Sequence, residues 1–410
     1  MHIIIIASQS MPSLSKQLGQ VSNVLGGWIE GSVLGLLKHT NLNISFFYPN
    51  STKPGVLKFY WQGINTFGMS IETISKVVMG QLVEQPPDVI HAYGTESNFV
   101  QELLRCFPDA PKVISVQGVM RENAKAFFKP LGNSERFNSV WMSSVALLKN
   151  LNALSFYKRS LVEKHALKNA QDIIGRTLMD KALSDQYGLN YHFNNETLRP
   201  TFYDAQLWSH EMCDKHRIYV SQGSYPLKGI HILIRALAMI EDEYPNMQCR
   251  IGGEDLCKNQ AITHKWGISY SNFVIRLIEH YGLQDHVHYI GFQSEEQVIN
   301  ELRHANCFVM PSLMENSPNA LGEAMLLGVP CIASRVGGIP TLLEEDVEGL
   351  LYTDQDVSEL ASKIKECFDN EILCNELSKN GRLRALKTHD IKTNALTLLD
   401  IYRTISRQRN

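Results

Sequence analysis

Short apolar runs alternate along this chain with longer amphipathic stretches, from residue 2 to the C-terminus. A run of four to eight apolar residues is typical of a buried strand, and the stretch after each run has helical periodicity. In the first half the pattern predicts two long helices that fill residues 119–168. It also predicts strands at 2–8, 43–48, 88–92, 112–117 and 172–175. Strands that alternate with helices predict an α/β protein with parallel sheets covered by helices.

The same alternation begins again near residue 217, after a polar and irregular stretch at 191–215 that we interpret as a linker. Two domains are expected, because 410 residues exceed what one ordinary core accommodates. We place them at 1–197 and 198–389, followed by one amphipathic helix at 390–410. The strands predicted in the second half are 217–221, 248–252, 287–290, 307–310, 330–333 and 350–352.

Composition narrows the class of protein. A hydrophobic content of 44% and a charged content of 20% are typical of a soluble globular protein. The net charge of −3 gives no reason to expect a nucleic-acid partner. The first apolar run, 2–7, is too short for a signal peptide or a membrane-spanning helix. The eight cysteines are scattered without a Cys-x-x-Cys pair, so we expect no zinc or redox motif and a cytoplasmic location.

Charge is unevenly distributed, and residues 119–168 are basic. This stretch contains nine Lys or Arg residues against three acidic residues, with six aromatic residues interleaved. A basic, aromatic, helical segment can lie on an anionic membrane surface, which would make the protein peripheral on the inner face of the membrane. A solvated helical face with its aromatic residues in the core is the simpler explanation of this composition. Both interpretations stay open here.

The most distinctive segment is 311–330, where Glu315 and Glu323 stand eight residues apart. It follows a predicted strand, and Pro318 occupies a favoured position for a helix start, which predicts a helix over 319–327. The unpaired N–H groups at such a helix start attract phosphate. Carboxylates accept hydrogen bonds from sugar hydroxyls. The segment therefore has the groups to hold both the anionic and the hydroxylated parts of a nucleotide-sugar.

Lys228 is the best candidate for a fixed cation, because it follows the strand predicted at 217–221 and precedes a predicted helix beginning at Gly229. Lysine binds phosphate as a mobile point charge, although a plain surface lysine is the alternative. Asp354 and Asp356 form the one Asp-x-Asp of the chain, and Asp356 is expected to cap the helix that follows. We therefore predict no metal site.

These motifs together resemble those of the family-4 (group 1) retaining glycosyltransferases, which carry a Glu-x7-Glu motif. The resemblance is strong in the second half, through Lys228-Gly229, Gly252-Gly253, Gly291-Phe292, Gly328-Val-Pro330 and Val336-Gly-Gly-Ile-Pro340. It is weaker in the first half, through Gly26-Gly27, Asp88-Val-Ile-His91 and Gln117-Gly118. It implies the GT-B fold, in which two Rossmann-like, doubly wound parallel-sheet domains face each other across a cleft. The C-terminal helix would cross back onto the N-terminal domain.

The resemblance also implies roles for single residues. Glu323 would bind the nucleotide ribose, and Glu315 would reach the transferred sugar. Lys228 would stabilise the diphosphate, and Glu315 and Lys228 are thus the candidate catalytic residues. The remaining donor contacts implied by the resemblance are the backbone of Asn319, Ala320 and Leu321 at the phosphate, the Gly26-Gly27 loop at the diphosphate, and the main chain near Tyr289 at the nucleobase.

Two positions depart from the family pattern. Gln117 stands where many relatives have a histidine that contacts the donor sugar, and glutamine can hydrogen-bond but cannot carry the proton charge. The arginine that usually precedes Lys228 is missing. Arg176 is a candidate for this second cation, but binding an acidic acceptor or forming a structural ion pair are equal alternatives.

The function implied is transfer of a hexose or N-acetylhexosamine from a UDP- or GDP-sugar to a saccharide or lipid-linked acceptor, with retention, in polysaccharide or glycoconjugate biosynthesis. The nucleotide-sugar is a co-substrate, and no cofactor, metal or nucleic acid is expected. One alternative is a nucleotide-sugar epimerase of the same fold. Another is a catalytically silent partner that binds a nucleotide, which the missing arginine and Gln117 would suit.

Overall fold

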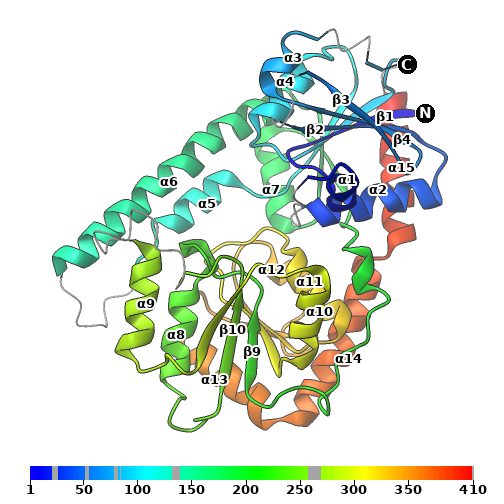
Figure 1. Cartoon of the computed structure of the whole chain (residues 1–410). Helices are drawn as coiled ribbons and strands as arrows, with labels where there is room; N and C mark the ends of the chain where they lie inside the picture. The colour runs from blue at the N-terminus through cyan, green and yellow to red at the C-terminus, as the bar shows by residue number, and fades with distance from the viewer. Residues whose placement is uncertain are drawn as a thin grey trace. The chain divides into compact units, whose positions relative to one another are not determined.

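The computed structural model describes residues 1–20, 26–50, 55–77, 82–83, 85–131, 139–256 and 269–408 (Figure 1). The chain forms two compact units, each described by itself below. Unit 1 comprises Met1–Met120, Lys158–Arg199 and Thr388–Asn410, and unit 2 comprises Arg121–Tyr157 and Pro200–Lys387. The chain passes between the units at 199/200 and at 387/388. Each point lies two residues from a predicted domain boundary, at 197/198 and 389/390. Residues 121–157, which we had placed in the N-terminal domain, group with unit 2.

Unit 1 is built on an eight-stranded sheet in the order β3-β4-β2-β1-β5-β6-β7-β8. Every neighbouring pair is parallel except β3 and β4, which are antiparallel at one edge. The strands are β1 (His2–Ala7), β2 (Asn43–Pro49), β3 (Leu57–Trp61), β4 (Ile64–Met69), β5 (Val89–Tyr93), β6 (Lys112–Ser115), β7 (Asp172–Gly175) and β8 (Asn190–Phe193).

Five of these strands were predicted, and three were not. The prediction missed β3 and β4, which form a hairpin whose two-residue turn has positive φ angles at Gln62 (49°) and Gly63 (92°). Positive φ angles at both central residues are typical of a type I′ turn, whose twist matches that of the flanking strands. The prediction of a linker from residue 191 was wrong for its first residues, because β8 lies there. This strand is at a sheet edge and only partly buried, so it lacks the apolar run of a central strand.

Helices cover both faces of the unit 1 sheet. Ile3 and Ile5 of β1 pack with α2 (Gly27–His39) and the C-terminal helix α15 (Ile391–Arg407), while Ile4 and Ile6 pack with α4 (Asn98–Arg105) on the other face. A strand covered on both sides explains why β1 is an unbroken apolar run. Because α15 belongs to unit 1, the prediction that the C-terminal helix returns to the first domain is confirmed. Further helices of this unit are α1 (Pro12–Gln17), α3 (Ile71–Ile74) and α7 (Leu178–Tyr187).

Unit 2 is built on a fully parallel six-stranded sheet in the order β11-β10-β9-β12-β13-β14, and all six of its strands were predicted. They are β9 (Arg217–Val220), β10 (Gln248–Gly252), β11 (Val287–Gly291), β12 (Cys307–Met310), β13 (Cys331–Ser334) and β14 (Leu350–Tyr352). The helices are η3 (Pro200–Phe202), η4 (Pro226–Lys228), α8 (Ile230–Ala238), α9 (Tyr270–His280), α10 (Glu295–His304), α11 (Asn319–Leu327), α12 (Ile339–Leu342), α13 (Val357–Asp369) and α14 (Glu371–Thr388).

Besides α14, whose last residue Thr388 already belongs to unit 1, two helices contain points where the chain passes between the units. They are α5 (Met120–Phe127) and the 30-residue α6 (Ser139–Lys168), and together they correspond to the helix pair predicted over 119–168. Residues 132–138, which link them, lie outside the described residues.

His91 joins the C-terminal helix to the centre of the unit 1 sheet. The side chain is fully buried on β5, where Nδ1 lies 2.7 Å from the Tyr402 hydroxyl of α15 and Nε2 lies 2.7 Å from the Ser115 hydroxyl of β6. A hydroxyl can donate or accept, so a neutral imidazole is fully satisfied between two of them. Burial lowers the pKa of His91 to about 3.

We expect His91 to make the stability of unit 1 depend on pH. Its pKa is lowered from 6.5 on folding, so its contribution is complete above pH 6.5 and is lost as the pH falls toward 3. This group alone should reduce the free energy of unfolding by about 2 kcal/mol between pH 7 and pH 5. Denaturant unfolding at both pH values should show a smaller pH effect in His91→Gln. The exposed His165→Gln serves as the control and should keep the full effect; equal pH effects in all three proteins would contradict the assignment.

Candidate active site

The order of strands in unit 2 fixes where a ligand is expected. The chain builds β9, β10 and β11 outward in one direction, and then returns to the other side of β9 to build β12, β13 and β14. The loops that follow β9 and β12 therefore leave the sheet in opposite directions and open a crevice at the carboxyl ends of these strands. Such a switch point is where open α/β sheets bind their ligands. Lys228 follows β9, and Glu315 follows β12.

These two loops touch through backbone atoms at Gly229. Its φ is +65°, and a Cβ atom on it would lie 1.7 Å from the carbonyl oxygen of Pro311. The N–H of Leu313 donates to the carbonyl of Leu227 at 2.7 Å, which completes the contact. Only glycine permits both this left-handed conformation and this close approach. The structure also corrects the expected helix start, because Lys228 ends the short 3-10 helix η4 and α8 begins only at Ile230.

The loop contact brings the predicted cation and the first carboxylate together. Lys228 Nζ lies 2.6 Å from Glu315 Oε1, and the Ser312 hydroxyl donates to the same oxygen at 2.8 Å. Lys228 also stands over the ring of Tyr225, 5.7 Å from its centroid. Burial disfavours the charged ammonium, but Glu315 and Tyr225 outweigh that effect and raise the pKa of Lys228 above its ordinary value. The lysine is therefore a permanent cation.

A third loop, which follows β13, holds the backbone of Glu315. The N–H of Gly338 donates to the Glu315 carbonyl at 3.0 Å, and the Ser334 hydroxyl donates to the Ser312 carbonyl at 2.5 Å. Gly337 has a φ of +54°, and a Cβ atom there would lie 1.9 Å from the same Glu315 carbonyl oxygen. Three loops from the neighbouring strands β9, β12 and β13 thus fix the position of one carboxylate.

The helix predicted over 319–327 is confirmed as α11, with Pro318 in the N-cap position. No side chain caps it, and the Leu321 N–H already donates to the Pro318 carbonyl at 3.1 Å. The N–H groups of Asn319 and Ala320 have no intrahelical acceptor and form the electropositive end of the helix. Glu323 lies further along α11 and is only 5% exposed. The segment after β12 thus carries a carboxylate paired with Lys228, a helix start without a side-chain cap and a second, buried carboxylate.

Tyr289 lies apart from this group. It is partly buried on the edge strand β11, and β10 and β9 separate that strand from β12. Tyr289 pairs in register with Ile251 of β10, close to the carboxyl end where the sheet register shifts at Gly252. Tyr289 thus lies near the carboxyl edge of the sheet, on a strand that neighbours neither β9 nor β12. Its role at the nucleobase stays a prediction.

The Asp-x-Asp motif is used structurally. Asp356 caps α13 by accepting a hydrogen bond from the Glu359 N–H at 2.9 Å, as predicted. Asp354 pairs with Lys129 at 2.5 Å. The same ammonium donates to the Leu313 carbonyl at 2.8 Å, so Lys129 is a second cation at the Glu315 loop that the sequence did not reveal. Within the part of the chain that the structure describes, no cluster of three metal-binding side chains is present.

In unit 1, two of the predicted donor-binding residues meet at a carboxylate that the prediction missed. Arg176 forms an ion pair with Glu196 at 2.9 Å, and the Gln117 amide donates to the same Glu196 oxygen at 2.9 Å. Both partners of the ion pair are buried, at 3% and 7% exposure. Of the alternatives for Arg176, the ion pair is the one the structure shows. Glu196 lies in the segment interpreted as linker, where nothing distinguished it from a surface residue.

Gly26 and Gly27 mark the start of α2, after the loop that follows β1. A Cβ atom on Gly26 would lie 2.2 Å from the Ser10 carbonyl oxygen, so the glycine is needed for packing of the loop against the helix start. The prediction that these glycines contact a diphosphate is untested by this packing and stays a prediction. Residues 21–25, which precede them, lie outside the described residues.

Sequence comparisons agree with this geometry. Residues 206–384 match the family model "Glycosyl transferases group 1". A D-inositol 3-phosphate glycosyltransferase from Mycolicibacterium smegmatis is 31% identical over 36% of this chain and 31% of its own length. The amylovoran biosynthesis glycosyltransferase AmsK from Erwinia amylovora is 30% identical over 41% of this chain and 46% of its own. The chain thus matches less than half the length of these curated relatives.

Solved structures show the same fold over nearly the whole chain. Sucrose-phosphate synthase from Thermosynechococcus elongatus has a TM-score of 0.73 at 18% identity and covers 99% of both chains. Anabaena HepE, in a structure with UDP-glucose, has a TM-score of 0.65 at 16% identity and covers 98% of this chain and 99% of its own. Residues 206–384 are therefore similar to the group 1 glycosyl transferases, and the two parallel-sheet units of the chain have the GT-B fold.

Proposed function

We propose that this protein is a retaining glycosyltransferase that moves a hexose or N-acetylhexosamine from a UDP- or GDP-sugar to a saccharide or lipid-linked acceptor. The reaction would serve polysaccharide or glycoconjugate biosynthesis and would need no metal ion. The observation that carries the proposal is the contact between Lys228 and Glu315 beside the start of α11. It places a permanent cation and an anion-binding helix end at the switch point of the sheet, where a diphosphate is best stabilised.

The leaving group dictates what the site must do. Negative charge grows on the diphosphate as the glycosidic bond breaks, and groups fixed in advance stabilise that charge most effectively. Lys228 and the N–H groups of Asn319 and Ala320 would supply this stabilisation. Glu315 neutralises Lys228, and an arriving diphosphate would share the ammonium with it. Glu315 would then be free to turn its second oxygen to a hydroxyl of the transferred sugar.

Lys129 is our candidate for the cation that replaces the missing arginine. Its ammonium contacts the Leu313 carbonyl, two residues before Glu315, whereas Arg176 is committed to a buried carboxylate. Asp354 neutralises Lys129 in the same way that Glu315 neutralises Lys228. Each cation thus has a local counter-ion that holds it in place until an anion binds.

The ribose and the acceptor are assigned to other groups. Glu323, almost fully buried on α11, would accept hydrogen bonds from the ribose hydroxyls. The diphosphate itself would take the acceptor proton on the front face, as the family resemblance implies, so no general base is required from Gln117. The relatives whose names mention inositol phosphate and amylovoran, and the HepE structure with UDP-glucose, support a nucleotide-sugar donor and a hydroxylated acceptor.

We also propose that the protein docks on an anionic membrane through α6. Four leucines of this helix are about half exposed, between 48% and 61%. They share one face with three basic residues, because the spacings alternate between three and four: Leu147, Leu151, Leu154, Lys158, Leu161, His165 and Lys168. Glu163 is buried, and no exposed carboxylate lies among the described side chains of α6. Among the described residues, no helix has the length and apolarity required to span a bilayer.

Lys228→Ala should lower kcat by about 100-fold or more, because a fixed charge at the leaving group is lost. Glu323→Gln keeps the size of the side chain and should weaken UDP or GDP binding by roughly tenfold, since a charged acceptor is removed. Calorimetry with both nucleotides and a turnover assay with their hexose conjugates measure the two effects. Lys365→Ala, an exposed lysine on α13, is the control and should behave as wild type. Nucleotide binding by wild type without turnover of any nucleotide-sugar would instead identify a catalytically silent protein.

Gly337→Ala should disturb the site through the Glu315 backbone. The new Cβ would collide with the Glu315 carbonyl, so the carboxylate should shift and the KM for the donor should rise by about tenfold or more. Gly282→Ala is the matched control, because that glycine also has positive φ but has open space around its Cβ position. Both variants should lose about 1–2 kcal/mol of stability to backbone strain. Equal donor KM values in the two variants would show that the Glu315 loop position is unimportant.

Leu151→Gln combined with Leu154→Gln should reduce sedimentation with vesicles that contain phosphatidylglycerol. Wild-type binding should fall steeply between about 50 and 300 mM salt, because the basic residues act through screened charge. Leu178→Gln combined with Leu383→Gln changes two exposed leucines elsewhere and is the control. Equal binding to neutral and anionic vesicles would remove the electrostatic part of the proposal, and unchanged binding of the α6 double variant would remove the leucine part.

A further inference from the structure

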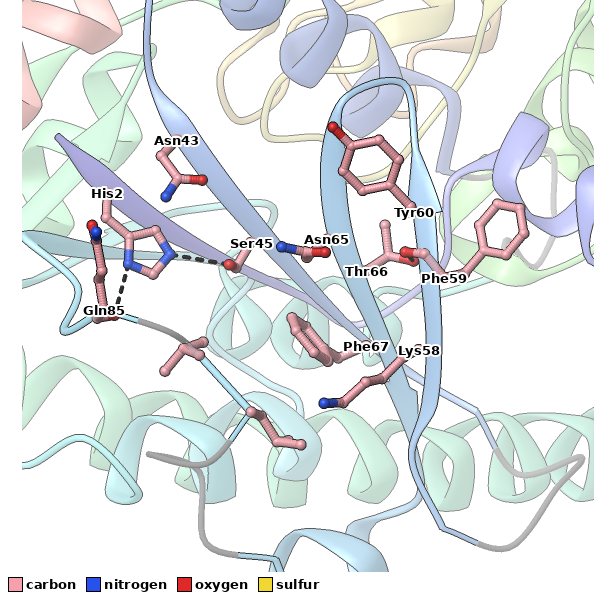
Figure 2. A pocket seen from close by; sticks show the side chains of 12 residues that line it. His2, Asn43, Ser45, Lys58, Phe59, Tyr60, Asn65, Thr66, Phe67 and Gln85 are labelled. Carbon is pink, nitrogen blue, oxygen red and sulfur yellow. Dashed lines mark hydrogen bonds between the residues drawn. The ribbon is translucent and has the colours of Figure 1, made fainter.

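A row of polar side chains crosses the unit 1 sheet near the amino ends of its parallel strands. The row runs through His2 of β1, Ser45 of β2, Asn65 of β4 and Tyr60 of β3. Ser45 pairs in register with Asn65, and Asn65 pairs with Tyr60, so these side chains are direct neighbours on one face (Figure 2). Further along the same face the strands turn apolar and pack under α4. The polar row therefore lies where the helical layer over this face of the sheet ends.

The row forms the floor of a cavity of about 410 Å³. This size falls within the range of small-molecule sites, about 300–1,000 Å³. The side chains of Asn43 and Lys58 complete its polar lining, and Leu82, Val83 and Gln85 close one side. Lys58 is the one charged residue among the described lining residues, and its ammonium stands 5.8 Å from the centroid of the Phe67 ring. The cavity is thus polar, with an excess of positive charge.

The cavity wall is held in place by His2. Its Nδ1 bonds to the Gln85 carbonyl at 2.9 Å, and its Nε2 lies 3.0 Å from the Ser45 hydroxyl, as Figure 2 shows. A carbonyl only accepts, so Nδ1 donates to it, and the Ser45 hydroxyl can pair with Nε2 as donor or acceptor. His2 is 5% exposed and Ser45 is 4% exposed, which makes this corner rigid. Tyr60 is 68% exposed at the rim and presents its ring to solvent.

We propose that this cavity binds a saccharide, and that it prefers one with a carboxylate. The amides of Asn43 and Asn65 each offer both donors and acceptors, which matches sugar hydroxyls that also do both. A phosphate only accepts, so the amide oxygens would face it unfavourably. The exposed ring of Tyr60 supplies an amphipathic surface for the apolar face of a pyranose. Lys58 adds a charge-assisted bond to a uronate carboxylate.

The cavity is separate from the carboxyl edge of the same sheet. His2 and Ala7 are at opposite ends of β1, roughly 16 Å apart at a rise of about 3.3 Å per residue. Gly26, Gln117 and Arg176 all follow carboxyl ends of strands. A sugar bound in the cavity therefore lies at the opposite edge of the sheet and cannot be the sugar that would react at the carboxyl edge. Its use as an anchor for a remote part of a polymeric acceptor rests on the proposed function. The binding of a saccharide in the cavity is independent of the proposed function.

The test is saturation-transfer NMR and calorimetry on the full chain, with maltotetraose as the neutral probe and tetragalacturonate as the acidic probe. We expect both to bind, with the acidic probe bound more tightly at low salt. Tyr60→Ala and Asn65→Ala should each weaken binding by about fivefold or more, and Lys58→Ala should abolish the preference for the acidic probe. Phe193→Ala removes an exposed aromatic residue from β8, at the other edge of the sheet, and should change neither affinity.

Two outcomes would overturn the inference: absence of saturation transfer from both probes, or unchanged affinities in Tyr60→Ala and Asn65→Ala with wild-type melting temperatures. Lys228→Ala keeps this test apart from the proposed reaction, since it should lose transferase activity but retain both oligosaccharide affinities. A probe that binds equally to the Tyr60 and Asn65 variants but is displaced by UDP would place the saccharide in the other unit and also overturn the site.

Discussion

The close approach of backbone at Gly229 is the contact on which the candidate site depends. A left-handed glycine with no room for a Cβ atom lets the loop after β9 lie against Pro311 of the loop after β12. That contact puts the Lys228 ammonium 2.6 Å from Glu315, although the two residues are 87 positions apart in the chain. Gly337 acts in the same way from the third loop. Fixed charges stabilise a growing charge better than mobile ones, so this backbone packing is what turns three loops into a site.

Unit 2 was predictable from sequence because most residues of β9, β12, β13 and β14 are buried. Each appears as a short apolar run, and glycines or prolines mark the loops at their carboxyl ends. In unit 1 the missed strands β3, β4 and β8 are at or next to sheet edges, and two of them alternate with polar residues. Their signal was weaker, although the turn at Gln62 and Gly63 could have revealed the hairpin. Within the site, α11 was predicted to the residue, but no spacing rule connects Lys228 to Glu315 or reveals Lys129.

Glu196 changes the interpretation of the first unit. A buried arginine whose ion pair is broken leaves an uncompensated charge, so Arg176 is unsuited to exchange its partner for a ligand. Glu196 also accepts from Gln117, which orients that amide and directs its remaining polar atoms away from the carboxylate. Gln117, which departs from the family pattern, is therefore held in one orientation by Glu196, a partner that the sequence did not suggest. What the structure shows for Arg176 is therefore a buried ion pair with Glu196.

The two ends of the unit 1 sheet differ for a physical reason. At the carboxyl ends the loops carry the polar groups, and the sheet beneath them is apolar. At the amino ends the strands themselves carry polar side chains, and Ser45 and Asn65 stand in the same rows as the buried Phe47 and Phe67. Burying polar groups without hydrogen-bond partners costs free energy. If this part of the sheet served only to extend the core, apolar side chains covered by a helix would be expected at these positions. The exposed amides of Asn43 and Asn65 instead keep their hydrogen-bonding groups accessible, which is the requirement for recognising a hydroxylated ligand.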